Sequence, residues 1–147
     1  MNYKIDHVDQ AEYPAIVQVW EASVRATHHF LKEADIQYFK PLILNTYLDV
    51  VDLRYARDSN KKILGFLGVA EQNLEMLFIA PECRGQKIGK TLLDYAITNL
   101  EVTKVDVNEQ NEQAVGFYQY YGFELVGRSE LDASGKPYPI LHMALKR

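Results

Sequence analysis

The chain has 147 residues, 48% hydrophobic and 24% charged, which suits a single domain, residues 1–147, with a sizeable core. The formal net charge of -4 argues against a nucleic-acid-binding protein, and no apolar run approaches the roughly 20 residues of a membrane-spanning helix. One cysteine excludes an intramolecular disulfide and the N-terminus lacks a signal-peptide pattern, so we expect a cytoplasmic protein that binds neither nucleic acid nor membrane.

The first half of the chain predicts a strand, two helical regions and a hairpin. Alternating apolar residues predict a strand at residues 3–7 and the two hairpin strands at residues 53–57 and 63–70. Helical apolar spacing predicts a helix at residues 14–27. A second helical region lies between the first helix and the hairpin. Asp35 can cap it, and Pro41 inside it predicts a kink or two short helices.

The segment from Leu74 to Leu100 is the most informative part of the chain. Leu74–Ile79 is a short apolar run, which suits a strand buried on both faces. Ile88–Leu100 has the spacing of an amphipathic helix. The loop between them carries glycine and positive charge, and it leads into a helix N-terminus with free N–H groups. This arrangement predicts a phosphate site.

The second half continues the alternation of strands and helices. Predicted strands lie at residues 104–107, 123–130 and 140–145, and a helix runs from Asn111 to Tyr121, where Gly122 provides a left-handed stop. Because a helix separates residues 74–79 from 104–107, we expect these strands to be parallel neighbours. The order β-α-α-β-β-β-α-β-α-β-β indicates a mixed α/β domain.

Two interpretations of the phosphate loop compete. Gly89-Lys90-Thr91 ends the loop as a Walker A motif does, but that motif needs a glycine where Arg84 stands, and Gly85 comes one residue late. No strand clearly supplies an acidic Walker B partner.

The second interpretation rests on two signatures. Arg84 and Gly89 fit the ends of a motif that runs Gln or Arg, two residues, Gly, one residue, Gly or Ala, although Lys87 replaces the middle glycine. A second signature follows about two dozen residues later and comprises Asn111, Ala114, Phe117, Tyr118, Gly122 and Phe123. Together they resemble the GCN5-related N-acetyltransferase (GNAT) family. The segment Arg25-Ala26-Thr27-His28 and the turn Gly135-Lys136-Pro137-Tyr138-Pro139 resemble its small stand-alone bacterial members.

The resemblance implies that acetyl-CoA binds where the strands 74–79 and 104–107 splay apart, with its pyrophosphate on the loop and helix N-terminus. The implied cofactor-binding residues are Leu77, Phe78, Ile79, Arg84, Gly85, Gln86, Lys87, Ile88, Gly89, Lys90, Asn111 and Tyr118. It also implies direct transfer of the acetyl group to a primary amine within a ternary complex. The acceptor is a small molecule or a peptide amine.

Two residues are candidates for proton transfer. Tyr118 lies on the apolar face of its helix and is either a packed aromatic or, as the resemblance implies, the acid that protonates the leaving thiolate. Glu75 interrupts the strand face that Leu77 and Ile79 continue, and some family members place a base-like glutamate there. Partial burial would raise its pKa towards the range of a general base.

The acceptor-side candidates are Arg25, Thr27, His28 and Tyr138, and each has an ordinary structural alternative. We expect no metal site, because adjacent histidines diverge, and no role for Cys83 as a nucleophile. A homodimer is possible. The rival functions are a non-catalytic acyl-CoA-binding or sensing domain on the same fold and a P-loop nucleotide-binding protein.

Overall fold

A computed structural model describes residues 3–146, and in this part of the chain seven strands form one sheet in the order β1-β2-β3-β4-β5-β7-β6. The strands are β1 (Tyr3–His7), β2 (Asp52–Asp58), β3 (Ile63–Ala70), β4 (Asn73–Ile79), β5 (Lys104–Asn108), β6 (Phe123–Ser129) and β7 (Ile140–Leu145). The α-helices are α1 (Tyr13–Thr27), α2 (Glu33–Asn45), α3 (Ile88–Asn99) and α4 (Glu112–Tyr120). The mixed α/β fold and the element order are as predicted.

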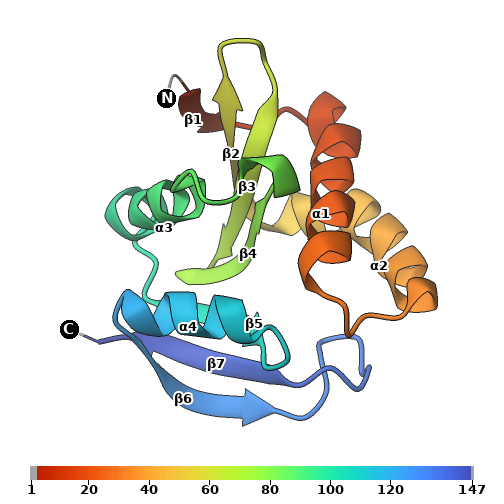
Figure 1. Ribbon diagram of the computed structural model, residues 1–147, viewed down its shortest axis with the longest axis vertical. Helices are drawn as coiled ribbons and strands as arrows, with labels where there is room; N and C mark the ends of the chain where they lie inside the picture. Colours follow the sequence, from red (N-terminus) through yellow and green to blue (C-terminus); the bar gives the residue numbers. More distant parts are fainter. Residues whose placement is uncertain (1–2, 147) are drawn as a thin grey trace.

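Helices cover both faces of the sheet. In Figure 1, α1 and α2 lie together on the right, and α3 and α4 lie on the left. The core on the α1–α2 side includes Trp20, Ile36 and Phe66, whereas the core on the other side includes Leu92 of α3 and Tyr118 of α4. The amphipathic helices read from the sequence therefore bury their apolar stripes against the sheet.

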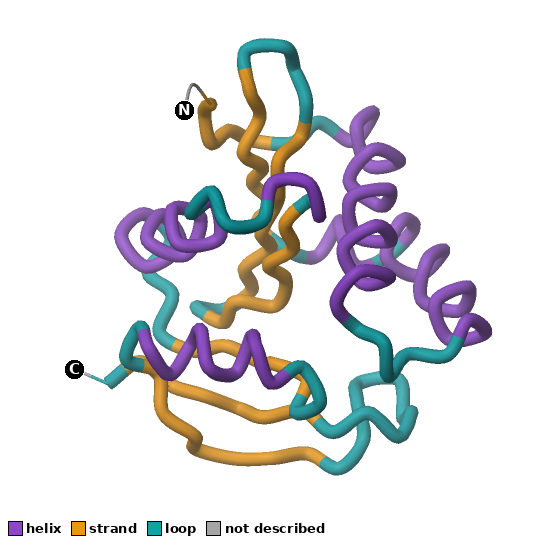
Figure 2. The backbone as a smooth tube through the Cα atoms, viewed as in Figure 1, coloured by secondary structure: helices purple, strands orange, loops and turns teal. Residues whose placement is uncertain are grey.

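The sheet opens in its middle. All neighbouring strands pair over several residues except β4 and β5, the parallel pair. Their pairing is limited to Asn73 with Lys104 and Leu74 with Val105. Beyond Leu74, β4 has no strand on the β5 side, and the tube in Figure 2 shows the two halves of the sheet diverging there. The predicted parallel neighbours are confirmed, and their splay makes room for a ligand.

The open edge explains why one burial prediction is wrong. The strand Leu74–Ile79 is not buried on both faces: only Leu74 is fully buried, and residues 76–79 are half-exposed. A strand at the centre of a sheet would normally be covered, but here the departure of β5 leaves its second half facing a cavity.

A β-bulge corrects the predicted orientation of Glu75. The register of β3 with β4 shifts between Gly68 and Val69, so that Met76 lies opposite Gly68 and Leu74 lies opposite Val69. Glu75 is the extra residue, and a bulge of this kind reverses the alternation of side chains. Leu74, not Glu75, shares the face that Leu77 and Ile79 continue, because these three pack in the α3–α4 core.

For α2, the predicted Asp35 cap is wrong, and the predicted division into two short helices at Pro41 is not observed. The helix runs unbroken from Glu33 to Asn45 with Pro41 inside it, and a short 3-10 helix follows at Tyr47–Val50. Lys32 occupies the N-cap position, so Asp35 lies in the first turn instead of capping the helix. Its carboxylate accepts a hydrogen bond from the Tyr138 hydroxyl and pairs with Lys136 at 3.0 Å. The Asp35 side chain is thus used in tertiary contacts with Tyr138 and Lys136.

Candidate active site

A cavity of about 460 Å³ lies at the splay between the two halves of the sheet. The end of α1, the open part of β4, the loop before α3, the start of α3 and the length of α4 contribute its walls. The lining residues that the sequence had predicted for the cofactor are Leu77, Phe78, Ile79, Arg84, Gly85, Lys87, Ile88, Gly89, Lys90, Asn111 and Tyr118. Gln86 is the one predicted member that lies outside this cleft, against other surface hollows.

The loop before α3 presents a row of unused backbone donors. Among the described residues, none of the N–H groups from Gly85 to Lys90 donates a hydrogen bond, whereas Thr91 N–H already bonds the Lys87 carbonyl. Such groups at a helix N-terminus, with the positive end of the helix dipole behind them, form an anion site. The loop can therefore hold a pyrophosphate without rearranging its own hydrogen bonds.

Lys87 explains how the loop tolerates a departure from the glycine pattern. It precedes α3 with φ of 64°, in the left-handed region that glycine occupies at low cost. The motif position is thus a true left-handed corner, and lysine adopts it at a strain cost of roughly 1–2 kcal/mol. The Lys87 ammonium also adds a positive charge beside the free N–H groups.

Arg84 spans the mouth of the cleft. Its Nη2 atom donates to Gln113 Oε1 of α4 at 2.6 Å, so it links the loop to the opposite wall. Arg84, Lys87 and Lys90 are all exposed, although Lys90 also makes a weak contact of 3.4 Å with Asp94. These three cations give an acidic protein a locally positive cleft, which suits a phosphate-bearing ligand.

Asn111 and Gly122 define the ends of α4. The Asn111 side chain caps the helix by accepting a hydrogen bond from Ala114 N–H at 3.3 Å, and it faces the cleft. Gly122 has φ of 98°, the predicted left-handed stop. Two residues of the second sequence signature therefore mark where α4 begins and ends. This helix places Tyr118 at the cleft.

Tyr118 is buried, with an exposed fraction of 6%, and packs edge-on against Phe117 and Phe123. Its hydroxyl has no hydrogen-bond partner among the described residues. It is also not sealed from solvent, because none of the sealed side-chain nitrogen and oxygen atoms in these residues lacks a partner. The hydroxyl therefore opens into the cleft. Burial raises the pKa of Tyr118 above its ordinary value, which keeps the hydroxyl protonated at neutral pH.

Glu75 lines a second cavity, of about 490 Å³, which we call the acceptor cavity. Its walls are Phe39, Tyr47, Glu75, Asp106, Asn108, Ser129, Leu131, Asp132, Ala133, Ser134, Ile140 and His142. The carboxylate reaches solvent, but the cavity walls reduce its hydration and Asp106 repels it, so the pKa of Glu75 is raised, with loss of hydration as the main cause. Asn73 Nδ2 donates to Glu75 Oε2 at 2.6 Å and opposes that shift.

The predicted acceptor-side residues fall into two groups. Thr27 and His28 line the cofactor cleft at the end of α1. Arg25 instead makes ion pairs with Glu21 and Glu33, at 2.9 and 2.6 Å, on the outer surface of the helix pair. Tyr138 is buried with an exposed fraction of 5%, and its hydroxyl contacts Asp35 and Lys32 N–H at the start of α2. Neither Arg25 nor Tyr138 lines the cleft or the acceptor cavity.

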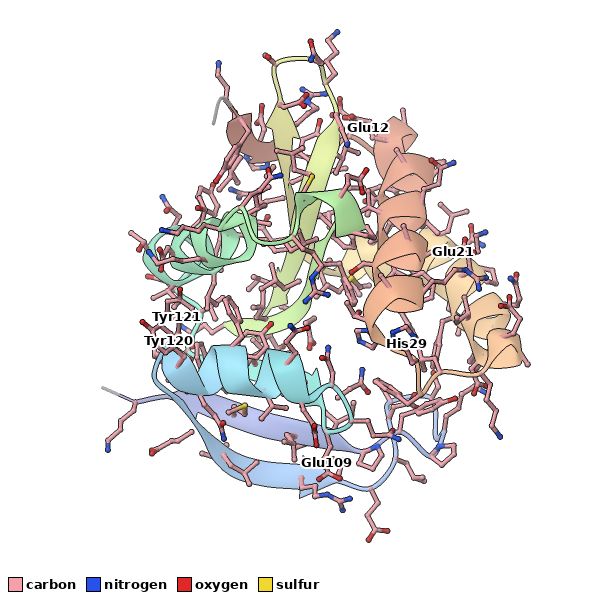
Figure 3. All side chains as sticks on the ribbon, in the orientation of Figure 1. Glu12, Glu21, His29, Glu109, Tyr120 and Tyr121 are labelled. Carbon is pink, nitrogen blue, oxygen red and sulfur yellow. The ribbon has the colours of Figure 1, made fainter. Side chains whose placement is uncertain are left out.

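His28 is a neutral histidine on the cleft wall. Burial, with smaller contributions from Arg84 and His29, lowers its pKa to about 4. Thr27 Oγ1 donates its proton to the Ser23 carbonyl at 2.8 Å, so the 2.7 Å contact with His28 requires Nδ1–H as donor. Nε2 is then the free acceptor of the ring. His29, labelled in Figure 3, is exposed, as expected for one of the pair.

Two further features of the described residues concern cysteine chemistry and metal binding. Cys83 is buried, and burial raises the pKa of its thiol, which opposes the thiolate form that a nucleophile needs. Within residues 3–146 no three His, Cys, Asp or Glu side chains are grouped as a metal site would require. None of the described helices has the length and hydropathy to cross a membrane.

The sequence reading missed Asp106 and His142. Each is a polar residue between two apolar neighbours in a strand: Asp106 lies between Val105 and Val107, and His142 lies between Leu141 and Met143. Glu75 was singled out by the same signal, so the pattern was available. Their proximity to Glu75 was not, because it depends on the strand order β4-β5-β7.

Comparison with known proteins gives one family. A family model described as an acetyltransferase (GNAT) domain matches residues 30–146. The peptidyl-lysine N-acetyltransferase YjaB of Salmonella typhimurium is 41% identical over 128 residues, which cover 87% of this chain and 88% of that protein. YiaC of Escherichia coli, also named a peptidyl-lysine N-acetyltransferase, is 29% identical over 90% of this chain and 91% of its own length.

Solved structures agree with the fold. The solution structure of apo-form YjaB from Escherichia coli superposes with a TM-score of 0.89 at 38% identity, covering 98% of this chain and 97% of that one. The PaiA N-acetyltransferase of Thermoplasma acidophilum, solved in complex with coenzyme A, has a TM-score of 0.71 at 20% identity with both chains fully covered. At 20% identity, the similarity to the Thermoplasma acidophilum structure supports the fold alone.

Proposed function

We propose that this chain, which belongs to the GNAT family of acetyltransferases, moves an acetyl group from acetyl-CoA to a lysine side chain of a peptide or protein. The amine acetyltransferase activity and the cofactor follow from the family, and they decide between the two phosphate-loop interpretations. The lysine acceptor is our proposal, supported by relatives named peptidyl-lysine N-acetyltransferases.

One observation carries the site assignment: the splay cavity joins an anion cradle to a free tyrosine hydroxyl. The N–H groups of Gly85 to Lys90 lie at one end, and Tyr118 faces the same cavity from α4. In our proposal, the pyrophosphate of acetyl-CoA binds the cradle and Arg84. Its pantetheine arm runs along the open edge of β4, at Leu77 to Ile79.

The proposed chemistry needs two proton transfers. The acceptor ammonium loses a proton to Glu75, directly or through water, and the neutral amine attacks the thioester carbonyl. When the carbon–sulfur bond breaks, the Tyr118 hydroxyl gives its proton to the departing thiolate. The raised pKa of Glu75 makes it a better base, whereas Tyr118 is protonated at neutral pH and can act as the proton donor.

The acceptor cavity supports a cationic acceptor. Three carboxylates line it, those of Glu75, Asp106 and Asp132, together with the aromatic rings of Phe39 and Tyr47. An ammonium on an aliphatic stem is attracted by the charges and packs against the rings. Lysine in an exposed peptide segment has this chemistry.

A panel of acceptors tests the proposal. Coenzyme A release, read with a thiol reagent, should be fastest with a peptide that has a blocked N-terminus and one internal lysine. The same peptide with acetyl-lysine in that position is the matched control. Equal release with both peptides, or faster turnover of a free α-amine or a polyamine, would exclude a lysine side chain as the preferred acceptor.

A further inference from the structure

Four side chains form a polar row across the face of the sheet that lines the acceptor cavity. Glu75 comes from β4, Asp106 from β5, His142 from β7 and Ser129 from β6, and all four border the cavity. Asp106 and His142 lie directly opposite each other in the β5–β7 pairing. Four strands that are distant in sequence thus supply one continuous cluster.

The row is joined by short hydrogen bonds. His142 Nδ1 lies 2.7 Å from Asp106 Oδ1, and His142 Nε2 lies 2.7 Å from the Ser129 hydroxyl. Because an ionised carboxylate only accepts, the proton of a neutral His142 sits on Nδ1 and the Ser129 hydroxyl donates to Nε2. Asp106 is therefore held by a ring whose other nitrogen can take up a second proton.

The same carboxylates meet at Asn73. Its Nδ2 atom donates to Glu75 Oε2 at 2.6 Å and to Asp106 Oδ2 at 3.1 Å. Two carboxylate oxygens that share one nitrogen are close enough for their charges to interact strongly. A like charge at that range favours the protonated form of its neighbour.

We infer that Asp106, held in place by His142, is a positioning residue that strengthens Glu75 as the base of the acetyl transfer, and that protonation of His142 reverses this effect. The inference rests on the proposed function of Glu75. When His142 is neutral, the full charge of Asp106 acts on Glu75. When His142 takes a proton at Nε2, the imidazolium compensates that charge and Glu75 becomes a weaker base.

The other charged groups around His142 do not carry this effect. The two cavities that His142 lines also contain Glu71, Lys104 and Asp132. Asp132 is committed to its own turn, where it accepts hydrogen bonds from the N–H groups of Ser134 and Lys136. Lys104 favours the ionised form of Glu75, opposite to Asp106, and so does not substitute for it.

The direct test is a carboxyl ¹³C NMR titration of Glu75, which needs no turnover. In Asp106→Asn the apparent pKa of Glu75 should fall by about one unit, because a neighbouring negative charge is removed. In His142→Gln, which keeps an N–H donor but cannot be protonated, it should rise instead. Asp9→Asn and His7→Gln change the same residue types at exposed positions and should leave the titration unchanged.

Kinetics then connect the coupling to the reaction. In Asp106→Asn the acid limb of the kcat/KM profile should move to lower pH, and the plateau should fall by at most about tenfold because a weaker base remains. An unshifted Glu75 titration in both variants, or a loss of rate uniform over pH, would overturn the inference and leave Asp106 with a structural role. If the wild type acetylated no amine, the proposed function would fail instead, and the NMR result would stand by itself.

Discussion

Tyr118 links the packing of α4 to the chemistry of the cleft. The ring contributes to the core beside Phe117 and Phe123, whereas the hydroxyl contacts no protein group among the described residues. Phenylalanine would provide the same ring packing, so packing alone does not require the hydroxyl at this cavity wall. The arrangement is consistent with a hydroxyl kept for a ligand.

Replacing Tyr118 by phenylalanine separates these two roles. We expect kcat and kcat/KM to fall together by about 100-fold, because the hydroxyl acts only as the carbon–sulfur bond breaks. Acetyl-CoA affinity and the melting temperature should barely change, since no hydrogen bond is lost. The matched control is Tyr120→Phe, at a position that is 83% exposed at the outer end of α4 (Figure 3). Wild-type turnover in Tyr118→Phe would return the tyrosine to a packing role.

Lys87 combines backbone strain with a useful charge, and two substitutions separate them. Lys87→Gly should raise the free energy of unfolding by roughly 0.5–1 kcal/mol, because glycine adopts the left-handed corner without strain. It should also weaken acetyl-CoA binding, as should Lys87→Gln, which keeps the strain and loses only the charge. Denaturant unfolding and calorimetric titration at two salt concentrations measure both effects. Lower stability in Lys87→Gly would contradict the strain argument.

His28 predicts a pH dependence of stability. Its pKa is lowered to about 4 in the folded protein, against an ordinary value near 6.5. The unfolded chain therefore binds this proton more tightly, and stability is lost as pH falls from about 6.5 towards 4, by at most about 1.4 kcal/mol per pH unit. Denaturant unfolding at pH 7 and pH 5 should show a smaller difference in His28→Gln than in the wild type. The same difference in both would show that His28 does not titrate in this way.

At the scale of elements, the N-terminus of α3 offers a position where a larger side chain would block the proposed anion site. Gly89 lies in its first turn, where an added Cβ would lie 3.7 Å from Ile79 and 3.9 Å from Phe117, an ordinary contact. Its φ is not in the left-handed region, so larger residues are compatible with the backbone. A longer side chain would extend into the cleft beside the anion cradle.

We therefore expect Gly89→Leu to weaken acetyl-CoA binding at least tenfold without loss of stability, since the helix itself favours leucine over glycine. Gly116→Leu is the matched control: it also replaces a helical glycine, at an exposed site on α4 with open space around it. Calorimetric titration with acetyl-CoA gives the comparison. Equal affinity in the two variants would place the cofactor elsewhere.

The elements themselves were largely predictable from the sequence, because their signals are local. β3 and β7 begin and end at the predicted residues, and α3 differs by one residue at its C-terminus. The failures arose where distant contacts decide. Tyr138 and Lys136, about 100 residues away, engage Asp35 and so remove it from the capping role. The bulge that turns Glu75 towards the acceptor cavity depends on the pairing with β3.

The candidate site shows the same division. The loop and the α4 signature are contiguous motifs, and almost all of the predicted cofactor residues line one cleft. Acceptor-side residues come from single positions on separate strands and helices, so chain order alone could not group Glu75 with Asp106 and His142. Nor could it show that Arg25 pairs with Glu33 of the next helix.

For the molecule as a whole, β4 lies between the cofactor cleft and the acceptor cavity, beside the splay of β4 and β5. The cofactor cleft is built mainly by α3, α4 and the end of α1, whereas the acceptor cavity is built by α2, β5, β6 and β7. β4 borders both, through Leu77 to Ile79 and through Glu75. The donor and the acceptor can thus approach from different directions and meet at one strand, as direct transfer in a ternary complex requires.

The most direct test of this account is the mass of a lysine peptide after incubation with the protein and acetyl-CoA. A peptide with a blocked N-terminus and one lysine should gain one acetyl group, located on the lysine side chain by fragmentation, and Gly116→Leu should behave as the wild type does. Gly89→Leu should yield much less product at the same acetyl-CoA concentration. An unmodified peptide with the wild type, under conditions in which acetyl-CoA raises its melting temperature, would contradict acetyl transfer to lysine and leave a domain that only binds the cofactor.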